Sequence, residues 1–375
     1  MREDILTTEL QKVSSESQRR ELYSMDWLDD KDKIIEGAFA ECYLKMHPMI
    51  CIHGILFTID GIVSDESGIK NDIYSMVRPY VTSGLARKVE QLLQTIKLEA
   101  YSEPLPLQTD RIHVANGTLF LNGEFSEQKD FCLNRLPVIY DPDVEKPARW
   151  LKFMEELLNP DDILTLQEYM GYMLLPTTKA QKMMLIIGKG GEGKSRIGLV
   201  LRELFGNNMY SCSLQKIEVD KFARANLEYM LITVDDDMKL EALPQTNHIK
   251  SIVTLEDQID LERKGQQSFQ GVVYARLIAF GNGGLHALYD KTDGFYRRQL
   301  ILTTKDKVDG REDDPYLIDK LRKERDGIFL WALEGLQRLV SNNYVFTESV
   351  DAKQNLVDAQ EEGNNILAFM KSEGY

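Results

Sequence analysis

The stretch that decides the fold is residues 183–205, MMLIIGKGGEGKSRIGLVLRELF. It starts with five consecutive apolar residues, passes through a glycine-rich segment at 188–195, and continues with helical periodicity over 196–205. A short apolar run next to glycines predicts a buried strand, and the spaced apolar residues after it predict a helix. The sequence therefore predicts a strand, a tight loop and a helix in direct succession.

The glycine-rich segment 188–195 (GKGGEGKS) fits the pattern GxxxxGK[ST]. In such a loop the backbone N–H groups wrap around phosphates, and the following helix adds the positive end of its dipole. Lys194 would reach the β- and γ-phosphates, and Ser195 would hold Mg²⁺. The glycines expected to shape the loop are Gly188, Gly190, Gly191 and Gly193. The carboxylate of Glu192 is expected to point outward, away from bound phosphates.

Three further apolar runs, at 230–234, 272–280 and 299–303, lie between helical stretches. Continuous apolar strands that alternate with helices are typical of a mostly parallel sheet covered on both faces. The fold class predicted for this part of the chain is therefore α/β.

Polar residues follow two of these strands. Asp235 and Asp236 directly follow the run MLITV (230–234). Acids at the end of a strand beside a phosphate loop are what Mg²⁺ coordination there requires. Asp235 is predicted on the metal side and Asp236 beside the attacking water, with Asp237 left open as a substitute. Asn282 ends a strand predicted to lie between the other two, where its amide would bond the γ-phosphate and orient water.

Two basic pairs admit both a structural and a functional interpretation. Arg297 and Arg298 precede the last strand; paired arginines often form surface salt bridges, but one presented to a neighbouring subunit would stabilise the charge of a γ-phosphate. The segment 260–265 (DLERKG) predicts a polar hairpin tip with Arg263 and Lys264 at its apex. Such a tip is either simply solvated or grips nucleic-acid phosphates without sequence preference.

The remaining chain is divided by composition. The segment 102–111 carries two prolines and no periodicity, which places a boundary there. The predicted segments are an α+β region at 1–105, a hairpin and helices at 106–178, the α/β core at 179–310 and a helical segment at 311–375. Within them we expect solvated helices around 16–20 and 29–33, strands over 48–63, a hairpin at 113–121, and helices at 83–100, 148–158 and 163–175.

Composition narrows the class of protein. The 375 residues are 43% apolar and 28% charged with a net charge of −15, which excludes a uniformly basic nucleic-acid coat. No apolar run reaches the roughly 20 residues of a membrane helix, no secretory signal opens the chain, and its cysteines form no CxxC pair. A soluble protein of a reducing compartment is expected. Cys42, His47, Cys51 and His53 match no standard zinc spacing.

The order of loop, acids, basic hairpin, asparagine and arginine resembles that of the superfamily-3 helicases, a branch of the AAA+ ATPases. It resembles most the helicase part of phage and plasmid primase-helicases, which are related to the poxvirus primase-helicase. The likeness runs over about 113–339 and includes HVANGTLFL, RLPVIYDPDVEKP, LQEYMGYMLL, LEDQIDLERKG, AFGNGG and DKTDGFYRRQL.

The resemblance implies an AAA+ phosphate-loop core and an ATP-dependent DNA helicase that moves 3′→5′ on single-stranded DNA as a hexameric ring. It places the protein in the replication of a phage, plasmid or other mobile element, in the host cytoplasm and without a membrane. A separate primase stays open as a partner. Residues 1–105 match the family only loosely, and a collar that holds the ring together is expected there from their position in the chain alone.

The resemblance also assigns roles to residues. ATP and Mg²⁺ would be bound through Lys194, Ser195 and Asp235, with Asp236 at the water. Asn282 would be the sensor. Arg298 would be the finger acting on the neighbouring subunit, with Arg297 as the fallback, and Lys264 with Arg263 would grip DNA.

Three other functions are weighed against this one. An AAA+ ATPase that remodels or loads at a replication origin would share the nucleotide residues and differ in lacking strand separation. A small-molecule kinase would need a lid of clustered arginines, which is not found between Asp235 and Asn282. A nonenzymatic DNA-binding scaffold would not need an intact Lys194 and Ser195.

Overall fold

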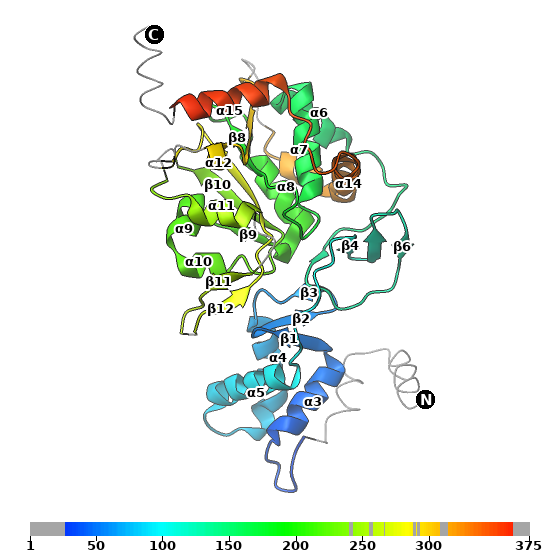
Figure 1. The fold of residues 1–375 in the computed structure, drawn as a ribbon. Coiled ribbons are helices and arrows are strands. Elements are labelled where there is room, and N and C mark those ends of the chain that lie inside the picture. The colour runs from blue at the N-terminus through cyan, green and yellow to red at the C-terminus, as the bar shows by residue number, and fades with distance from the viewer. Residues whose placement is uncertain are drawn as a thin grey trace. The chain divides into compact units, whose positions relative to one another are not determined.

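The computed structural model describes residues 27–239, 243–254, 258–265, 267–287, 290, 293–307 and 314–362 (Figure 1). Two units divide the chain: one comprises Met1–Pro106 and Asp130–Leu133, the other Leu107–Lys129 and Asn134–Tyr375. Within the described residues, none of the helices combines the length and apolarity needed to cross a bilayer.

The first unit packs helices against a small antiparallel sheet of order β1-β2-β3. Its elements are α3 (Glu36–Met46), β1 (Met49–Ile52), β2 (Ile55–Thr58), β3 (Gly61–Ile62), α4 (Ser67–Val77), a 3₁₀ turn (Arg78–Tyr80) and α5 (Leu85–Glu99). The strands predicted over 48–63 and the helix predicted over 83–100 are confirmed. Val89, Leu92, Leu93 and Ile96 form the buried stripe of α5, as their spacing requires.

One helix predicted in this unit is wrong. Residues 29–33 form a turn in which the Asp29 carboxylate accepts hydrogen bonds from the backbone N–H groups of Lys31 and Lys33, both at 2.8 Å. An aspartate that caps its own turn competes with helix formation, which charge patterning alone does not reveal. The helix predicted around 16–20 lies outside the described residues.

The second unit is built on a five-stranded sheet in which every pairing is parallel. The order is β14 (Gln299–Thr303), β8 (Met183–Ile187), β13 (Arg276–Gly281), β10 (Ile232–Met238) and β9 (Met209–Ser211). The predicted strands at 183–187 and 299–303 are confirmed residue for residue. Those predicted at 230–234 and 272–280 start later, at 232 and 276, and the short edge strand β9 was not predicted.

Helices cover both faces of this sheet (Figure 1). On β8, Met184 and Ile186 join one apolar core and Met183 and Leu185 the other, because successive side chains of a strand point to opposite faces. The helices between strands are α8 (Ser195–Phe205), α9 (Leu214–Val219), α10 (Lys221–Ala225), α11 (Asn247–Thr254) and α12 (Asp293–Tyr296). The predicted α/β class with a parallel sheet is confirmed.

A helical layer from both ends of this unit packs on the face that carries α8. It comprises α6 (Ala148–Leu157), α7 (Pro160–Tyr172), α13 (Leu317–Lys323) and α14 (Arg325–Ser341), with α15 (Val350–Glu362) beside β14. The helices α7 and α14 approach closely: a Cβ placed on Gly335 would lie 2.2 Å from the Gln167 carbonyl oxygen. The segments 106–178, 179–310 and 311–375 therefore contribute to one core.

The second unit also holds a four-stranded sheet of order β6-β5-β4-β7. Its strands are β4 (Arg111–Val114), β5 (Gly117–Phe120), β6 (Phe125–Ser126) and β7 (Arg135–Leu136). The hairpin predicted over 113–121 is confirmed, since β4 and β5 pair antiparallel around Ala115-Asn116.

Candidate functional site

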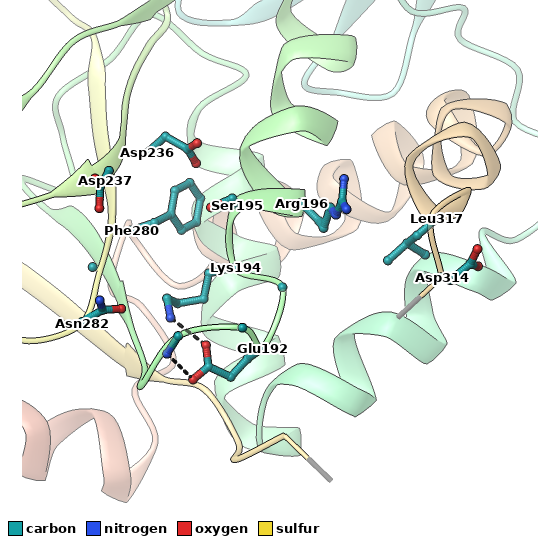
Figure 2. Close-up of a pocket in the computed structure, with 14 residues that line it drawn as sticks. Glu192, Lys194, Ser195, Arg196, Asp236, Asp237, Phe280, Asn282, Asp314 and Leu317 are labelled. Carbon is teal, nitrogen blue, oxygen red and sulfur yellow. Dashed lines mark hydrogen bonds and ion pairs between the residues drawn. The ribbon is translucent and has the colours of Figure 1, made fainter. Parts of the chain in front are cut away.

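A pocket of about 400 Å³ lies at the carboxyl ends of β8, β13 and β10 (Figure 2). The carboxyl edge of a parallel sheet is the usual ligand position in open α/β folds, because the loops that leave the strands converge there. The lining residues are Gly190, Gly191, Glu192, Gly193, Lys194, Ser195, Arg196, Asp236, Asp237, Phe280, Gly281, Asn282, Asp314 and Leu317.

The glycine-rich loop joins β8 to α8 and forms one wall of the pocket. Gly190, Gly191 and Gly193 have φ values of 111°, 85° and 110°, which side chains with a Cβ rarely adopt. A Cβ on Gly188 would lie 2.1 Å from the Thr304 hydroxyl oxygen. All four predicted glycines are thus required by conformation or by space, and the loop reaches Ser195 where α8 begins.

Glu192 does not point outward as expected. The residue is only 3% exposed, and its carboxylate accepts hydrogen bonds from the Gly190 backbone N–H at 2.7 Å and from Lys194 Nζ at 2.8 Å (Figure 2). Burial by itself would raise the pKa of Glu192, but the bonds from Lys194 and from backbone N–H groups outweigh it and lower the pKa. The loop's lysine and its acid therefore form a buried ion pair.

The three acids of β10 separate into two groups. Asp235 is 4% exposed and accepts a hydrogen bond from the Leu214 backbone N–H at 2.9 Å, and burial raises the pKa of its carboxyl. Asp236 and Asp237 are exposed and line the pocket. The structure thus brings Asp236 to the loop but leaves Asp235 outside the pocket, and it adds Asp237, which the sequence left open.

A bulge in β10 explains this arrangement. Asp235 pairs with Ala279 of β13 and Met238 with Gly281, so the stretch between them has one more residue in β10 than in β13. An extra residue interrupts the alternation of side chains along a strand. Asp236 and Asp237 can therefore lie on the same pocket, as Figure 2 shows, although they are adjacent in sequence.

Asn282 directly follows β13, and β13 lies between β8 and β10 as predicted. Its amide borders the loop, because its Oδ1 would be 4.0 Å from a Cβ placed on Gly190. The structure thus brings Asn282, Lys194, Ser195 and Asp236 to one pocket, from three neighbouring strands.

The opposite wall of the pocket was not predicted. It consists of Arg196 in α8, Asp314, and Leu317 at the start of α13 (Figure 2). Asp314 accepts hydrogen bonds from Lys320 Nζ at 2.7 Å and from the Tyr316 backbone N–H at 3.0 Å, and the bond from Lys320 lowers its pKa. The one sequence signal is the position of Arg196 next to the loop, since the other two residues are more than a hundred positions away.

Arg297 and Arg298 lie at the amino ends of the strands, on the side of the sheet opposite to the pocket. They precede Gln299, which pairs with Met183 at the start of β8, whereas Thr303 pairs with Ile187 beside the loop. The length of the strands, roughly 13 Å at 3.3 Å per residue, separates the two edges. Neither arginine lines the pocket of its own chain.

The two arginines differ in availability. Arg298 is half-buried and donates a hydrogen bond to the Gly294 carbonyl oxygen, and burial is the main cause of its lowered pKa. The Arg297 side chain is 63% exposed, with Nη1 4.0 Å from the Asp293 carboxylate. The exposed member is thus Arg297, the fallback of the sequence analysis.

The basic hairpin is formed by β11 (Ile259–Leu261) and β12 (Phe269–Gly271), which pair antiparallel. Arg263 is held by an ion pair with Glu228, whose side chain is 1% exposed, and lies 4.9 Å above the Phe269 ring. Lys264 is exposed next to Gly265, which has a φ of 77°. The hairpin is confirmed; Lys264 of the predicted pair is exposed, whereas the Arg263 side chain is only 20% exposed.

The side chains of the described residues were considered as possible ligands of a metal ion. The described part of the chain contains no group of three or more His, Cys, Asp or Glu side chains arranged to hold a metal ion by themselves. The side-chain oxygens that line the pocket belong to Glu192, Ser195, Asp236, Asp237, Asn282 and Asp314, and of these the Ser195 hydroxyl and the Asp236 and Asp237 carboxylates are the candidates for a metal ion. These hard donors suit Mg²⁺, which normally takes one or two carboxylates and completes its shell with water and substrate phosphates.

Known proteins of similar sequence or structure support the fold described above. Residues 186–298 match a family described as a family of unknown function (DUF5906). An apo structure of the C-terminal region of NrS-1 is similar with a TM-score of 0.58 and 12% identity, over 92% of this chain and 78% of that one. Another apo structure of that region, in its A form, gives 0.55 and 11% over 86% and 74%. At this identity the likeness shows a shared fold.

Proposed function

We propose that this protein is an ATP-dependent DNA helicase of the superfamily-3 type that acts in the replication of a phage or another mobile element. The observation that carries the proposal is one pocket in which Lys194 and the glycine-rich loop face Asp236, Asp237 and Asn282. The shared fold adds support, because NrS-1 is a phage primase-helicase.

The loop would hold the phosphates of ATP through its backbone N–H groups and Lys194. The Ser195 hydroxyl and the Asp236 carboxylate would hold Mg²⁺, which neutralises the charge that develops on the phosphates. Asp237 would orient the attacking water, and Asn282 would contact the γ-phosphate from the neighbouring strand. In this proposal Asp236 takes the metal position that was predicted for Asp235.

Asp235 would act on α9 instead. Its carboxylate accepts the bond of the first backbone N–H group of α9, a donor that has no partner within the helix. This role is structural. The aspartates that act at the pocket would then be its two neighbours, Asp236 and Asp237.

A second copy of the chain would complete the pocket. Because Arg297 lies at the amino edge of its own sheet, it can reach a γ-phosphate only in a neighbouring copy. Repetition of such a head-to-tail contact closes into a ring when the rotation between copies allows it. We therefore propose a ring, of six copies as in the superfamily-3 helicases that the sequence resembles, with Arg297 as the finger and Arg298 holding the turn through Gly294.

Single-stranded DNA would be gripped by the hairpin tip. Lys264 is the exposed cation there, and Arg263 fixes the base of the tip through Glu228. One lysine per copy, repeated around a ring, would follow the DNA backbone without reading its sequence.

The experiment is ATP hydrolysis with and without single-stranded DNA, on protein whose mass is measured in the same buffer. DNA-stimulated hydrolysis by a species near six times 43.1 kDa, together with opening of a duplex that carries a 3′ tail, is the expected result. Hydrolysis that is indifferent to DNA, without strand opening, would instead support an ATPase that remodels or loads at an origin. No hydrolysis by the wild type would reject both.

A further inference from the structure

The Glu192 carboxylate occupies the place where the glycine-rich loop would bind an anion. Its partners are the Gly190 backbone N–H at 2.7 Å and Lys194 Nζ at 2.8 Å. A loop of this kind binds phosphate with the same two kinds of donor, backbone N–H groups and a lysine ammonium. The acid that satisfies them here is part of the loop itself.

The pair is sequestered from water. The side chains of Lys194 and Glu192 are 8% and 4% exposed. Removal of either partner from such a pair leaves the other charge desolvated, so the two groups separate only when another group replaces the lost contact. An incoming phosphate can do this for Lys194, and Glu192 gains solvent when it leaves the pocket.

The loop has the freedom to release Glu192. Glycines with positive φ stand on both sides of it, Gly191 at 85° and Gly193 at 110°, and no atom lies within 4 Å of a Cβ placed on Gly191. Rotation about these residues turns the Glu192 side chain without moving β8 or α8.

We infer that Glu192 is an internal competitor of the nucleotide: its carboxylate holds the phosphate position of the loop, and a nucleotide binds only by displacing it from Lys194 and Gly190. The inference rests on the proposed function, because it concerns the same pocket. A competing charge in the loop selects for ligands with several phosphates, since a monophosphate offers fewer contacts to replace it. It also weakens the hold on ADP, which favours release of the product.

The experiment compares ADP binding by the wild type and by Glu192→Gln, using isothermal titration calorimetry with Mg²⁺ present. Glutamine keeps the size of the side chain and loses the charge. We expect the variant to bind ADP roughly tenfold more tightly than the wild type. This factor corresponds to the lower end of the free energies of hydrogen bonds to charged groups. The gain for AMP should be no larger than the gain for ADP, because both ligands displace the same carboxylate.

A matched control separates competition from a general change of charge. Asp306 pairs with Lys189 of the same loop at 2.9 Å, but both side chains are more than 70% exposed. Asp306→Asn removes one negative charge beside the loop without freeing Lys194, so its ADP affinity should stay within about twofold of the wild type, as for exposed ion pairs.

The outcomes are separable. If the wild type binds ADP and a folded Glu192→Gln binds it equally or more weakly, the competitor role is wrong and the proposed function stands. If neither binds ADP or ATP, both proposals fail. If thermal melting shows that Glu192→Gln does not fold, Glu192→Asp serves instead. Its shorter carboxylate no longer reaches both donors, so tighter ADP binding is expected, and unchanged binding overturns the inference.

Discussion

The carboxylate of Asp235 accepts a hydrogen bond from the backbone N–H of Leu214, 2.9 Å away, and is thereby turned from the pocket that the next two residues line. Three consecutive aspartates thus carry two different tasks. The first fixes the start of α9, and the other two are available for chemistry.

Substitution of the acids should separate these tasks. Asp236→Asn and Asp237→Asn are expected to lower the ATP hydrolysis rate by about a hundredfold or more, the usual contribution of a group that handles the attacking water or its metal. Asp235→Asn should stay within about threefold of the wild type, because asparagine still accepts the Leu214 bond. Steady-state hydrolysis rates test this, and the reverse order would return the metal role to Asp235.

The two lysines of the glycine-rich loop form a matched pair. Lys194→Ala should abolish ATP binding and hydrolysis, because it removes the buried ammonium group of the loop. Lys189→Ala removes only an exposed ion pair with Asp306 and should change ATP affinity by about twofold at most. Fluorescence titration with a labelled ATP analogue measures both. Equal losses in the two variants would show that charge alone, and not the position of Lys194, determines binding.

The arginine assignment is tested by mixing inactive chains. Arg297→Ala should lower hydrolysis about a thousandfold, as loss of an arginine finger does, and leave ATP binding nearly intact. A mixture of Arg297→Ala and Lys194→Ala chains should regain activity, because some interfaces then join a wild-type loop to a wild-type arginine. Recovery with Arg298→Ala but not with Arg297→Ala would reverse the two roles. No recovery with either would argue against action between subunits.

The two basic residues of the hairpin should respond differently. Lys264→Ala is expected to keep basal hydrolysis and lose its stimulation by single-stranded DNA. Arg263→Ala removes the ion pair of the buried Glu228 carboxylate, so it should lower the melting temperature of the protein. Thermal melting and DNA-stimulated hydrolysis distinguish them. Stimulation that survives in folded Lys264→Ala would remove the hairpin from the DNA site.

Asp162 should make stability depend on pH. It is buried in the first turn of α7, where it accepts a bond from the Ser349 hydroxyl, and burial is the main cause that raises its pKa above 3.8. The folded state therefore holds this proton more tightly than the unfolded state, and the wild type loses stability as the pH rises through the folded pKa. Asp162→Asn should melt at a higher temperature at pH 7.

The advantage of Asp162→Asn should shrink as the pH falls and should be lost below 3.8, where the carboxyl is protonated in both the folded and the unfolded state. Asp161→Asn, at the exposed neighbouring position, is the control and should show a much weaker trend, because the Asp161 charge is the smallest of the causes that raise the pKa of Asp162. An Asp162→Asn advantage that is constant with pH would assign its effect to packing instead of to the charge.

The sequence predicted what depends on local pattern. The strand at 183–187, the loop and α8 were readable because a buried apolar run, glycines and a periodic helix follow one another directly. The prediction that Asn282 ends a strand lying between the loop strand and the acid strand also agrees with the observed order β8-β13-β10. Local signals that agree with one another are the ones that sequence reasoning recovers.

What was missed depends on pairing and on distance. The orientation of the three aspartates depends on a bulge, which shows only when β10 is paired with β13. The inward turn of Glu192 depends on a bond to Lys194 inside the folded loop. The wall formed by Asp314 and Leu317 comes from a remote part of the chain that carries no motif.

The position of Arg297 has a consequence for how variants of this protein are interpreted. If the cation that completes each pocket is supplied by another chain, only the assembly is active. An isolated copy would then not hydrolyse ATP even when it is perfectly folded. A surface substitution far from any phosphate that loosens the contact between copies would then have the kinetic signature of a lost active-site group. Sedimentation of each inactive variant measures its oligomeric state. It therefore distinguishes a variant with a damaged pocket from a variant whose copies no longer assemble.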